Sequence, residues 1–285
     1  MDTVLRSRSN ELTIGSGRPF CIIGERINPT GRKAFQAQLQ QGDLSQIEID
    51  VAEQVASANV LDVNVGDPLA DEVGLMGQAI PLVQGLTDLP LCIDSSIIEA
   101  LEAGLAAYEG KALVNSVTGE DERLGAILPI VARYGAAVIG LANDDEIRMD
   151  PKERVAIAKK IVSAAGDFGI PPEDIVIDPL AMPIGAEPRA VTSFIATLHL
   201  LQEELGVNTT CGASNTSFAM PSRHALGATF LAIAQSHGLT SAIMDARTPQ
   251  CVEAVRAGDL LLGNDEYGGA WIGRWRKQKA AAEAS

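Results

Sequence analysis

Short apolar segments alternate along the chain with longer segments of helical periodicity. Eight segments are rich in β-branched or other apolar residues, and each precedes a stretch long enough for a helix: 20–24, 60–65, 91–94, 112–117, 136–141, 175–179, 208–212 and 242–245. Continuous apolar runs of this length are typical of parallel strands buried on both faces. The pattern therefore predicts eight βα units, the number that closes a (βα)8 barrel.

The eight predicted units form one continuous series. No linker rich in Gly, Ser or Pro divides them, and a barrel commonly takes about 250 residues of a chain. A doubly wound sheet is disfavoured because no GxGxxG motif follows the first strand. We therefore expect one α/β domain over residues 1–285, with the barrel core at 18–265 and a frayed tail at 274–285.

Polar residues interrupt the apolar pattern where the predicted strands end. A polar side chain in a buried strand costs about 1–3 kcal/mol unless it finds a partner. The carboxyl ends of barrel strands carry the active site in this fold, so we expect these side chains to converge at one rim. They are Glu25, Asn28, Asp62, Asn64, Asp94, Asn115, Asn143, Asp178, Asn215 and Asp245.

The types of these polar residues restrict the chemistry of the rim. They are acids and amides with almost no cations, and they include no Ser–His–Asp arrangement, which disfavours phosphate esters and acyl transfer by serine. A carboxylate accepts two parallel bonds from adjacent N–H groups of a flat heterocycle, and an Asn amide both donates and accepts. The rim therefore predicts a pterin or a similar amidine-bearing ligand.

Composition excludes several other classes of protein. The net charge of −15, without clusters of Lys and Arg, disfavours a nucleic-acid partner. No apolar run approaches the roughly 18 residues of a membrane span, and the N-terminus lacks the apolar stretch of a signal peptide, so we expect a cytoplasmic protein without a membrane contact. The four cysteines form no CxxC pair and the three histidines lack ligand spacing, which predicts free buried thiols and no metal.

Six motifs follow one another at the spacing of the predicted strands. They are IIGERIN at 22–28, DVNVGDP at 62–68, CIDSS at 92–96, VNS at 114–116, IDPL at 177–180 and SNTSF at 214–218. In this order they resemble the pterin-binding methyltransferases, which include the methyltetrahydrofolate–corrinoid protein methyltransferases and the folate domain of cobalamin-dependent methionine synthase. The resemblance implies a pterin-binding barrel like that of dihydropteroate synthase.

The resemblance also implies roles for individual residues. Asp94, Asn115 and Asp178 would hold the pterin ring, and Asn215 would lie nearest to N5 as an electrostatic stabiliser. The proton would come from water or from a carboxylate-linked network, for which Asp94 is the best-suited carboxylate. The further candidates for binding or support are Glu25, Asp62, Asn64, Gly212, Ser214 and Arg223.

The activity implied by the resemblance is reversible transfer of the N5 methyl group between 5-methyltetrahydrofolate and the cobalt of a corrinoid such as cobalamin. The chain has no DxHxxG stretch of the kind found in cobalamin-binding domains, so the corrinoid would be carried by a separate protein. Members that act on corrinoid iron–sulfur proteins often have a polar residue where this chain has Phe218, and methionine synthases have an aromatic one. The resemblance further implies a homodimer.

Simpler interpretations exist for the same residues. Asp94 could be the N-cap of the next helix, and Asp178 could simply cap or end its strand. Asn115 and Asn215 could be turn residues whose amides bond to the local backbone. Asp62 and Asn64 fit hydrogen bonds within the barrel interior, and loop 143–150 fits either a solvated loop or a docking surface.

Glu25 and Arg26 fit either a structural ion pair that closes the first loop or contacts with substrate. Among other functions, dihydropteroate synthase is disfavoured because NVTPDSFSDGG-like, DPGIGF-like and SRK motifs are absent. A non-catalytic pterin-binding partner subunit stays open.

Overall fold

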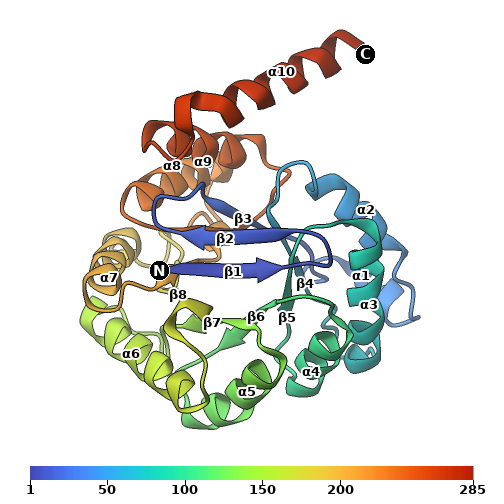
Figure 1. Cartoon of the computed structure of the whole chain (residues 1–285), viewed down its shortest axis with the longest axis vertical. Helices are drawn as coiled ribbons and strands as arrows, with labels where there is room; N and C mark the ends of the chain where they lie inside the picture. Colours follow the sequence, from blue (N-terminus) through green and yellow to red (C-terminus); the bar gives the residue numbers. More distant parts are fainter. Residues whose placement is uncertain (285) are drawn as a thin grey trace.

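The computed structural model describes residues 1–284 and contains a barrel of eight parallel strands (Figure 1). The sheet order is β10-β3-β4-β5-β6-β7-β8-β9, and the parallel bridge between Gly212 and Ile243 joins its two ends. The predicted (βα)8 fold is therefore confirmed. The strands are β3 (Cys21–Ile27), β4 (Val60–Val63), β5 (Leu91–Asp94), β6 (Leu113–Val117), β7 (Ala137–Leu141), β8 (Ile175–Asp178), β9 (Asn208–Thr209) and β10 (Ser241–Met244).

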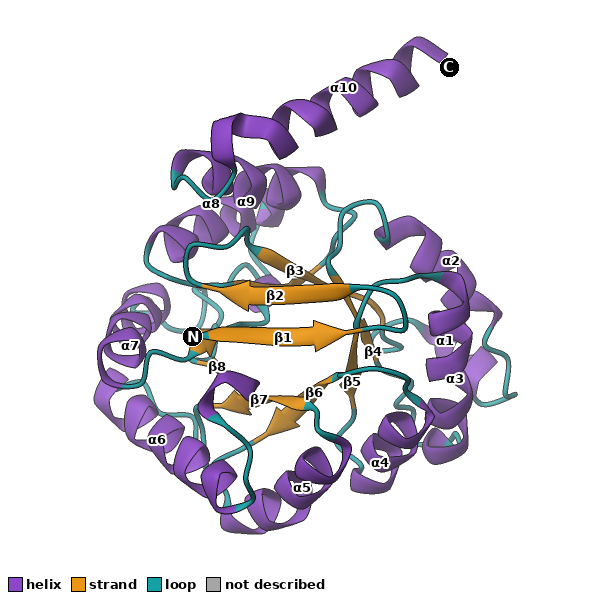
Figure 2. Ribbon diagram, viewed as in Figure 1, coloured by secondary structure: helices purple, strands orange, loops and turns teal. Residues whose placement is uncertain are grey.

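At least one helix follows each barrel strand, and apart from α10, which projects away from the barrel, these helices surround the sheet (Figure 2). No helix in the part of the chain that the structure describes is both long and apolar enough to cross a membrane. The helices are α1 (Lys33–Leu39), α2 (Ser45–Gln54), α3 (Glu72–Leu86), α4 (Ile98–Ala107), α5 (Asp121–Tyr134), α6 (Pro151–Asp167), α7 (Ala190–Glu204), α8 (Arg223–Ser236), α9 (Pro249–Leu261) and α10 (Gly269–Ala284).

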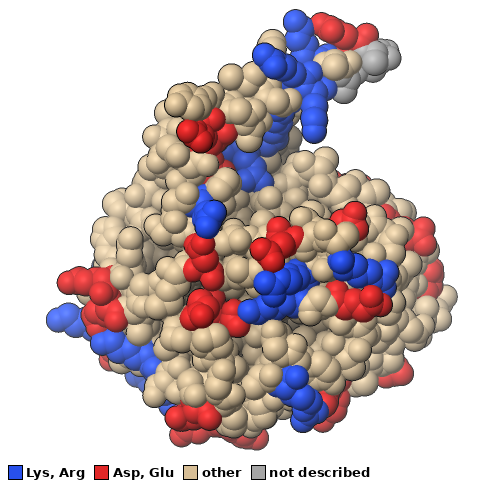
Figure 3. All heavy atoms as spheres, in the orientation of Figure 1, with Lys and Arg blue, Asp and Glu red and all other residues tan. Residues whose placement is uncertain are grey.

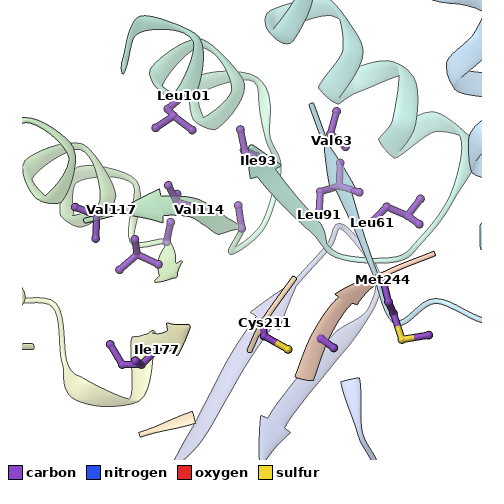
Figure 4. Packing of buried hydrophobic residues seen from close by; sticks show 14 of the residues in the cluster. Leu61, Val63, Leu91, Ile93, Leu101, Val114, Val117, Ile177, Cys211 and Met244 are labelled. Carbon is purple, nitrogen blue, oxygen red and sulfur yellow. The ribbon is translucent and has the colours of Figure 1, made fainter. Parts of the chain in front are cut away.

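Alternation along the strands divides the core into two parts. Side chains that point outward, such as Leu61, Ile93 and Val114, pack between the sheet and the helices (Figure 4). Their sequence neighbours point inward, because successive side chains of a strand face opposite sides. The inward set that fills the barrel interior consists of Cys21, Ile23, Val60, Cys92, Leu113, Ala137, Ile139 and Val176.

An N-terminal hairpin, which the sequence analysis did not predict, closes the interior at the amino ends of the strands. Strands β1 (Asp2–Arg6) and β2 (Glu11–Gly15) pair antiparallel and lie across the barrel (Figure 1). Leu5 and Ile14 are completely buried against the inward set. Asn208 of β9 donates to the Ile14 carbonyl at 2.9 Å, which fixes the hairpin to the barrel. The carboxyl ends of the strands form the opposite, open end, called the mouth below.

The C-terminal segment is helical where we expected a frayed tail at 274–285. Residues as far as Ala284 belong to α10, and Ser285 lies outside the described residues. The Asp265 carboxylate accepts hydrogen bonds from the backbone N–H groups of Ala270 and Trp271, at 2.9 and 2.8 Å. Free N–H groups at a helix start need such an acceptor, so Asp265 stabilises the first turn of α10.

Candidate functional site

The polar residues predicted at the strand ends do converge at the mouth. Along β5, Cys92 points into the barrel interior, and Asp94 therefore points inward one layer nearer the mouth. Asn115 of β6 lies beside Asp94 in register, and Asp178 of β8 lies beside Leu141 of β7. Above the apolar interior the barrel thus carries a layer of acids and amides on neighbouring strands.

Two amide side chains orient the acids of β4 and β5. Asn64 donates through Nδ2 to Oδ2 of Asp94 at 2.9 Å, and its own oxygen accepts from the N–H of Gly66 at 2.8 Å. Asn115 donates through Nδ2 to Oδ1 of Asp62 at 3.3 Å. The hydrogen bonding that we considered for Asp62 and Asn64 within the barrel therefore exists, and it joins these residues to Asp94 and Asn115.

Asp62 and Asp94 form a pair of buried carboxyls at the base of the mouth. Burial raises the pKa of Asp62 well above its usual value, and the neighbouring Asp94 charge raises it further. Burial also raises the pKa of Asp94, to about 6, although hydrogen bonds from Asn64 and Asp62 act in the opposite direction. Two close carboxyls cannot both ionise without a large cost. Burial therefore favours retention of a proton by this pair, on Asp62 before Asp94.

Asp178 occupies a separate position that several backbone contacts fix. Its Oδ1 accepts from the N–H of Leu180 at 2.7 Å, and Leu180 has a positive φ of 66°, which is strained for a branched residue. Burial raises the pKa of Asp178 to about 7, against the opposing effects of the Leu180 and Gly212 N–H groups and of Arg154. Asp178 can therefore gain or lose a proton near neutral pH.

Arg154, which the sequence analysis did not single out, supports the turn that carries Asp178. It is fully buried on α6 and donates to the carbonyls of Pro179 and Leu180, at 2.7 and 3.4 Å. Its Nε donates to the Arg148 carbonyl at 2.6 Å. No motif marks Arg154, because it lies in an ordinary helix start. The available signal was its spacing, which puts Arg154 on the same face of α6 as the apolar residues Ala158 and Ile161.

The loop after β9 brings a second group of predicted residues together. Ser214 donates to Glu25 at 2.6 Å, and Arg223 donates to the Ser214 carbonyl at 3.1 Å. Burial raises the pKa of Glu25, although the hydrogen bond from Ser214 opposes this. Asn215 is exposed at the mouth, and a Cβ atom on Gly212 would lie 3.0 Å from its Nδ2. Gly212 therefore leaves the space that the Asn215 amide occupies.

Two adjoining cavities open at the mouth. One of about 280 Å³ is lined by Asp62, Asp94 and Asn115, and one of about 300 Å³ is lined by Ser214 and Arg223. Glu25 and Asp245 line both cavities. Neither cavity is lined by Asp178, Asn215, Asn64 or Gly212. A larger cavity, of about 390 Å³, lies at the opposite end beside the hairpin and contains none of the predicted site residues.

The expectation of almost no cations at the rim is wrong. Arg26 and Arg32 line the cavity of Asp62 and Asp94. Arg32 binds Asp50 through both terminal nitrogens, at 2.6 and 2.9 Å, whereas Arg26 approaches Asp50 only to 3.6 Å. Arg247 binds Asp245 at 2.8 Å and Glu53 at 2.7 Å. These arginines lie in or beside the loops after β3 and β10, which the strand pattern does not place.

The alternative of an ion pair between Glu25 and Arg26 does not hold. Glu25 bonds to Ser214, and Arg26 contacts Asp50 instead. The structure thus separates these sequence neighbours: Arg26 belongs to the charged cluster around Asp50, and Glu25 faces the two cavities.

The cysteines and histidines lie apart from this chemistry. All four cysteines are free, and Cys21, Cys92 and Cys211 are buried, as predicted. His199 and His237 share a hydrogen bond of 2.8 Å beside the cavity near the hairpin. Within residues 1–284, no group of three or more His, Cys, Asp or Glu side chains is placed to hold a metal ion.

A parallel barrel with a layer of acids and amides at its mouth belongs to the class of (βα)8 barrels with a polar pocket at the carboxyl ends of the strands, where the active site of this fold lies. The family described as "Pterin binding enzyme" matches residues 24–245 of this chain. The match covers all eight barrel strands apart from the first three residues of β3. The chain therefore belongs to the pterin-binding enzyme family.

Individual relatives agree with this assignment. The chain is 30% identical over 251 residues to a methylcorrinoid:tetrahydrofolate methyltransferase of Eubacterium limosum, a match that covers 86% of this chain and 92% of the relative. Dihydropteroate synthase of Thermus thermophilus, in complex with 6HMPPP, superposes with a TM-score of 0.62 at 23% identity over 90% of this chain and 99% of that one. Dihydropteroate synthase of Xanthomonas albilineans, in complex with 7,8-dihydropteroate, superposes with a TM-score of 0.63 at 20% identity. That match covers 91% of this chain and 98% of the synthase. At these identities the synthases share the fold.

Proposed function

We propose that this protein is a methyltransferase that moves the N5 methyl group between 5-methyltetrahydrofolate and the cobalt of a corrinoid on a separate protein. The observation that carries the proposal is the inward-facing set of Asp94, Asn115 and Asp178 at the mouth. The name of the Eubacterium limosum relative, which joins a methylcorrinoid and tetrahydrofolate, supports it. The proposal includes the cytoplasmic location and the homodimer expected above.

The acids and amides suit the hydrogen-bonding edge of a pterin. The amidine part of the ring presents adjacent N–H donors, which a carboxylate such as Asp178 or Asp94 accepts in pairs. The Asn115 amide provides both a donor and an acceptor for the remaining ring groups. Because the pKa of Asp94 is about 6 and that of Asp178 about 7, N–H donors of a bound pterin would keep both carboxyls ionised near neutral pH.

The chain also offers a source of the proton that the reaction requires. When N5 loses its methyl group it keeps the bonding electron pair, so a proton or a strong hydrogen bond at N5 lowers the barrier. The Asn215 amide donates a hydrogen bond but cannot release a proton at neutral pH. We assign the proton to the Asp62–Asp94 pair, which holds one at the base of the mouth. In the reverse direction the same pair takes the proton back.

The corrinoid would supply the cobalt that accepts or donates the methyl group. Its carrier protein must approach the mouth, where N5 would lie. Three exposed apolar side chains stand on separate loops after barrel strands: Leu69, Ile147 and Phe218. Exposed apolar residues around a polar pocket suit a protein partner. Loop 143–150, which contains Ile147, is therefore part of the surface that we assign to the corrinoid protein.

The test is a titration with 5-methyltetrahydrofolate followed by addition of cob(I)alamin. Calorimetry measures binding, and the absorbance of the corrinoid measures methyl transfer. We expect Asp178→Asn to lose affinity and Asn215→Ala to lose mainly rate. Asn10→Ala, which alters an exposed Asn in the turn of the hairpin at the opposite end of the barrel, should change neither and serves as the control.

Other outcomes would separate the alternatives. Binding without transfer, even with corrinoid proteins, would identify a non-catalytic pterin-binding subunit. Formation of dihydropteroate from a pterin pyrophosphate and p-aminobenzoate would identify a synthase. Absence of pterin binding would show that the mouth of the barrel is not a pterin-binding site.

A further inference from the structure

Most arginines of this chain lie close to an acid. On the face around the hairpin, Arg18 lies 2.6 Å from Asp2, and Figure 3 shows basic side chains beside acidic ones on this face. At the mouth, Arg32 lies 2.6 Å from its acidic partner and Arg247 lies 2.7 Å from one of its partners. Such pairing compensates a charge for the water that it loses on folding. Arg26, which lines the same mouth, departs from this pattern.

Arg26 has no acid at hydrogen-bonding distance. The nearest is Asp50, whose carboxylate lies 3.6 Å from Nε and already accepts from both terminal nitrogens of Arg32. Among the residues that the structure describes, the buried Nε of Arg26 has no hydrogen-bond partner. Burial lowers the pKa of Arg26, and the neighbouring charges of Arg32 and Arg247 lower it further. Arg26 therefore carries a charge that the chain itself compensates poorly.

The Arg26 side chain faces the same cavity as the acids of the mouth. Asp62, Asp94 and Asn115 line that cavity together with Arg26. The side chain of Arg26 is 30% exposed, so a ligand in the cavity can reach its guanidinium group. A ligand held by the acids and amides would therefore meet a cation at another wall of the same cavity.

The orientation of a bound pterin decides which part of the ligand meets this cation. Asp94, Asn115 and Asp178, on β5, β6 and β8, suit the amidine edge of the ring. The long substituent of a folate leaves the ring from C6, at the opposite edge. It would point away from these strands, towards β9, β10 and β3, which complete the circle. Arg26 is the last residue but one of β3.

The substituent of a folate ends in a glutamate, which carries two carboxylates. A guanidinium group binds a carboxylate through two parallel hydrogen bonds, and these charge-assisted bonds are stronger than bonds between neutral groups. We propose that Arg26 binds a carboxylate of the glutamate tail, so that the mouth selects folates over pterins without a charged tail. This inference rests on the proposed function, because it requires a pterin in the mouth. Arg26 determines specificity and takes no part in the transfer of the methyl group.

The test compares 5-methyltetrahydrofolate with its diamide, in which both carboxylates of the tail are amidated. The two ligands share the ring and the shape of the tail and differ in its charge. We expect calorimetry to show that the wild-type protein binds the acid at least about tenfold more tightly than the diamide, because the diamide lacks the charge-assisted pair. In Arg26→Gln the acid should bind about tenfold more weakly, and the diamide should keep its affinity within about twofold. Arg26→Lys keeps the charge without the paired N–H groups and should give an intermediate loss.

A matched control removes a positive charge elsewhere. Arg133 lies in the last turn of α5, where it pairs with Glu102, and Arg133→Gln should leave both affinities unchanged. Circular dichroism verifies that each variant is folded. At saturating 5-methyltetrahydrofolate, Arg26→Gln should transfer the methyl group in a single turnover as fast as the wild type, because Arg26 contacts the tail and not N5.

The outcomes separate this inference from the proposed function. If the wild-type protein binds the acid and the diamide equally well, or if its preference for the acid survives Arg26→Gln, Arg26 does not bind the tail and the proposed function still stands. A loss in Arg26→Gln that is equally large for both ligands would identify a purely structural residue. If neither ligand binds to the wild-type protein, the proposed function fails and this inference fails with it.

Discussion

Asp62 and Asp94, on the neighbouring strands β4 and β5, form a pair of buried carboxyls at the base of the barrel mouth. Burial and the Asp94 charge raise the pKa of Asp62 well above its usual value, so a proton held by the pair is favoured on Asp62. We expect Asp62→Asn to lower the rate of methyl transfer by about tenfold to a hundredfold, because it removes a proton that can be transferred. Pterin affinity should change little. Single-turnover kinetics separates the two effects, and an unchanged rate would exclude Asp62 as the proton store.

Asp178 lowers the stability of the folded protein as the pH rises. Its folded pKa of about 7 exceeds the usual 3.8, so the folded state binds the proton more tightly than the unfolded state. The contribution of this proton to the free energy of unfolding is therefore fully present below pH 3.8. It is lost as the pH rises through about 7. Asp178→Asn should therefore stabilise the protein by ~2–4 kcal/mol at pH 8 and by less at pH 5. Urea unfolding at both pH values measures the difference, and a gain that is larger at pH 5 would contradict it.

Pterin affinity should increase with pH across the range in which these acids ionise. The pKa values of Asp94 and Asp178 are about 6 and about 7, and both groups accept N–H donors better when ionised. Calorimetry between pH 5.5 and 8 should show an affinity that rises and then levels off. The rise in affinity has one step near pH 6, from Asp94, and one near pH 7, from Asp178. In the Asp178→Asn variant the step near pH 7 should disappear and the step near pH 6 should persist. A flat profile for the wild-type protein would show that neither carboxyl carries the binding.

Arg154 should act through the orientation of Asp178. Arg154→Met leaves the Pro179 and Leu180 carbonyls without their donor, and we expect a loss of stability of ~3 kcal/mol and about tenfold weaker pterin binding. The positive charge of Arg154 also lowers the pKa of Asp178, so the upper step in the affinity profile should move to higher pH. A loss of stability without this movement would indicate a purely structural residue.

Gly212 gives an independent test of Asn215. A methyl group at Gly212 would lie 3.0 Å from Nδ2 of Asn215 and would displace the amide. Gly212 has a φ of −70°, which alanine adopts without strain. Gly212→Ala should therefore keep pterin affinity and lower the transfer rate by about tenfold, as Asn215→Ala does. If the double variant is much slower than either single variant, the two residues act separately.

The barrel was predictable because short apolar strands alternate along the chain with helical segments. The mouth was predictable because polar residues interrupt the apolar pattern where those strands end. A strand buried on both faces is apolar until its end, so Asp94, Asn115 and Asp178 stood out in the sequence. The hairpin was missed because its strands are short and mix charged and apolar residues; Leu5 and Ile14 reveal their burial only once a barrel exists beneath them. Arg32 and Arg247 were missed for a related reason. The position of a loop side chain depends on which other loop it meets, as Arg247 meets Glu53.

The hairpin also has a consequence for the order in which the protein is completed during synthesis. Residues 2–15 leave the ribosome before the partners on which they dock, because Thr3 donates to the Glu173 carbonyl, 170 residues later, and Asn208, 194 residues after Ile14, donates to the Ile14 carbonyl. The hairpin must therefore wait for the seventh barrel strand before it can dock, and Leu5 and Ile14 stay accessible to chaperones until then.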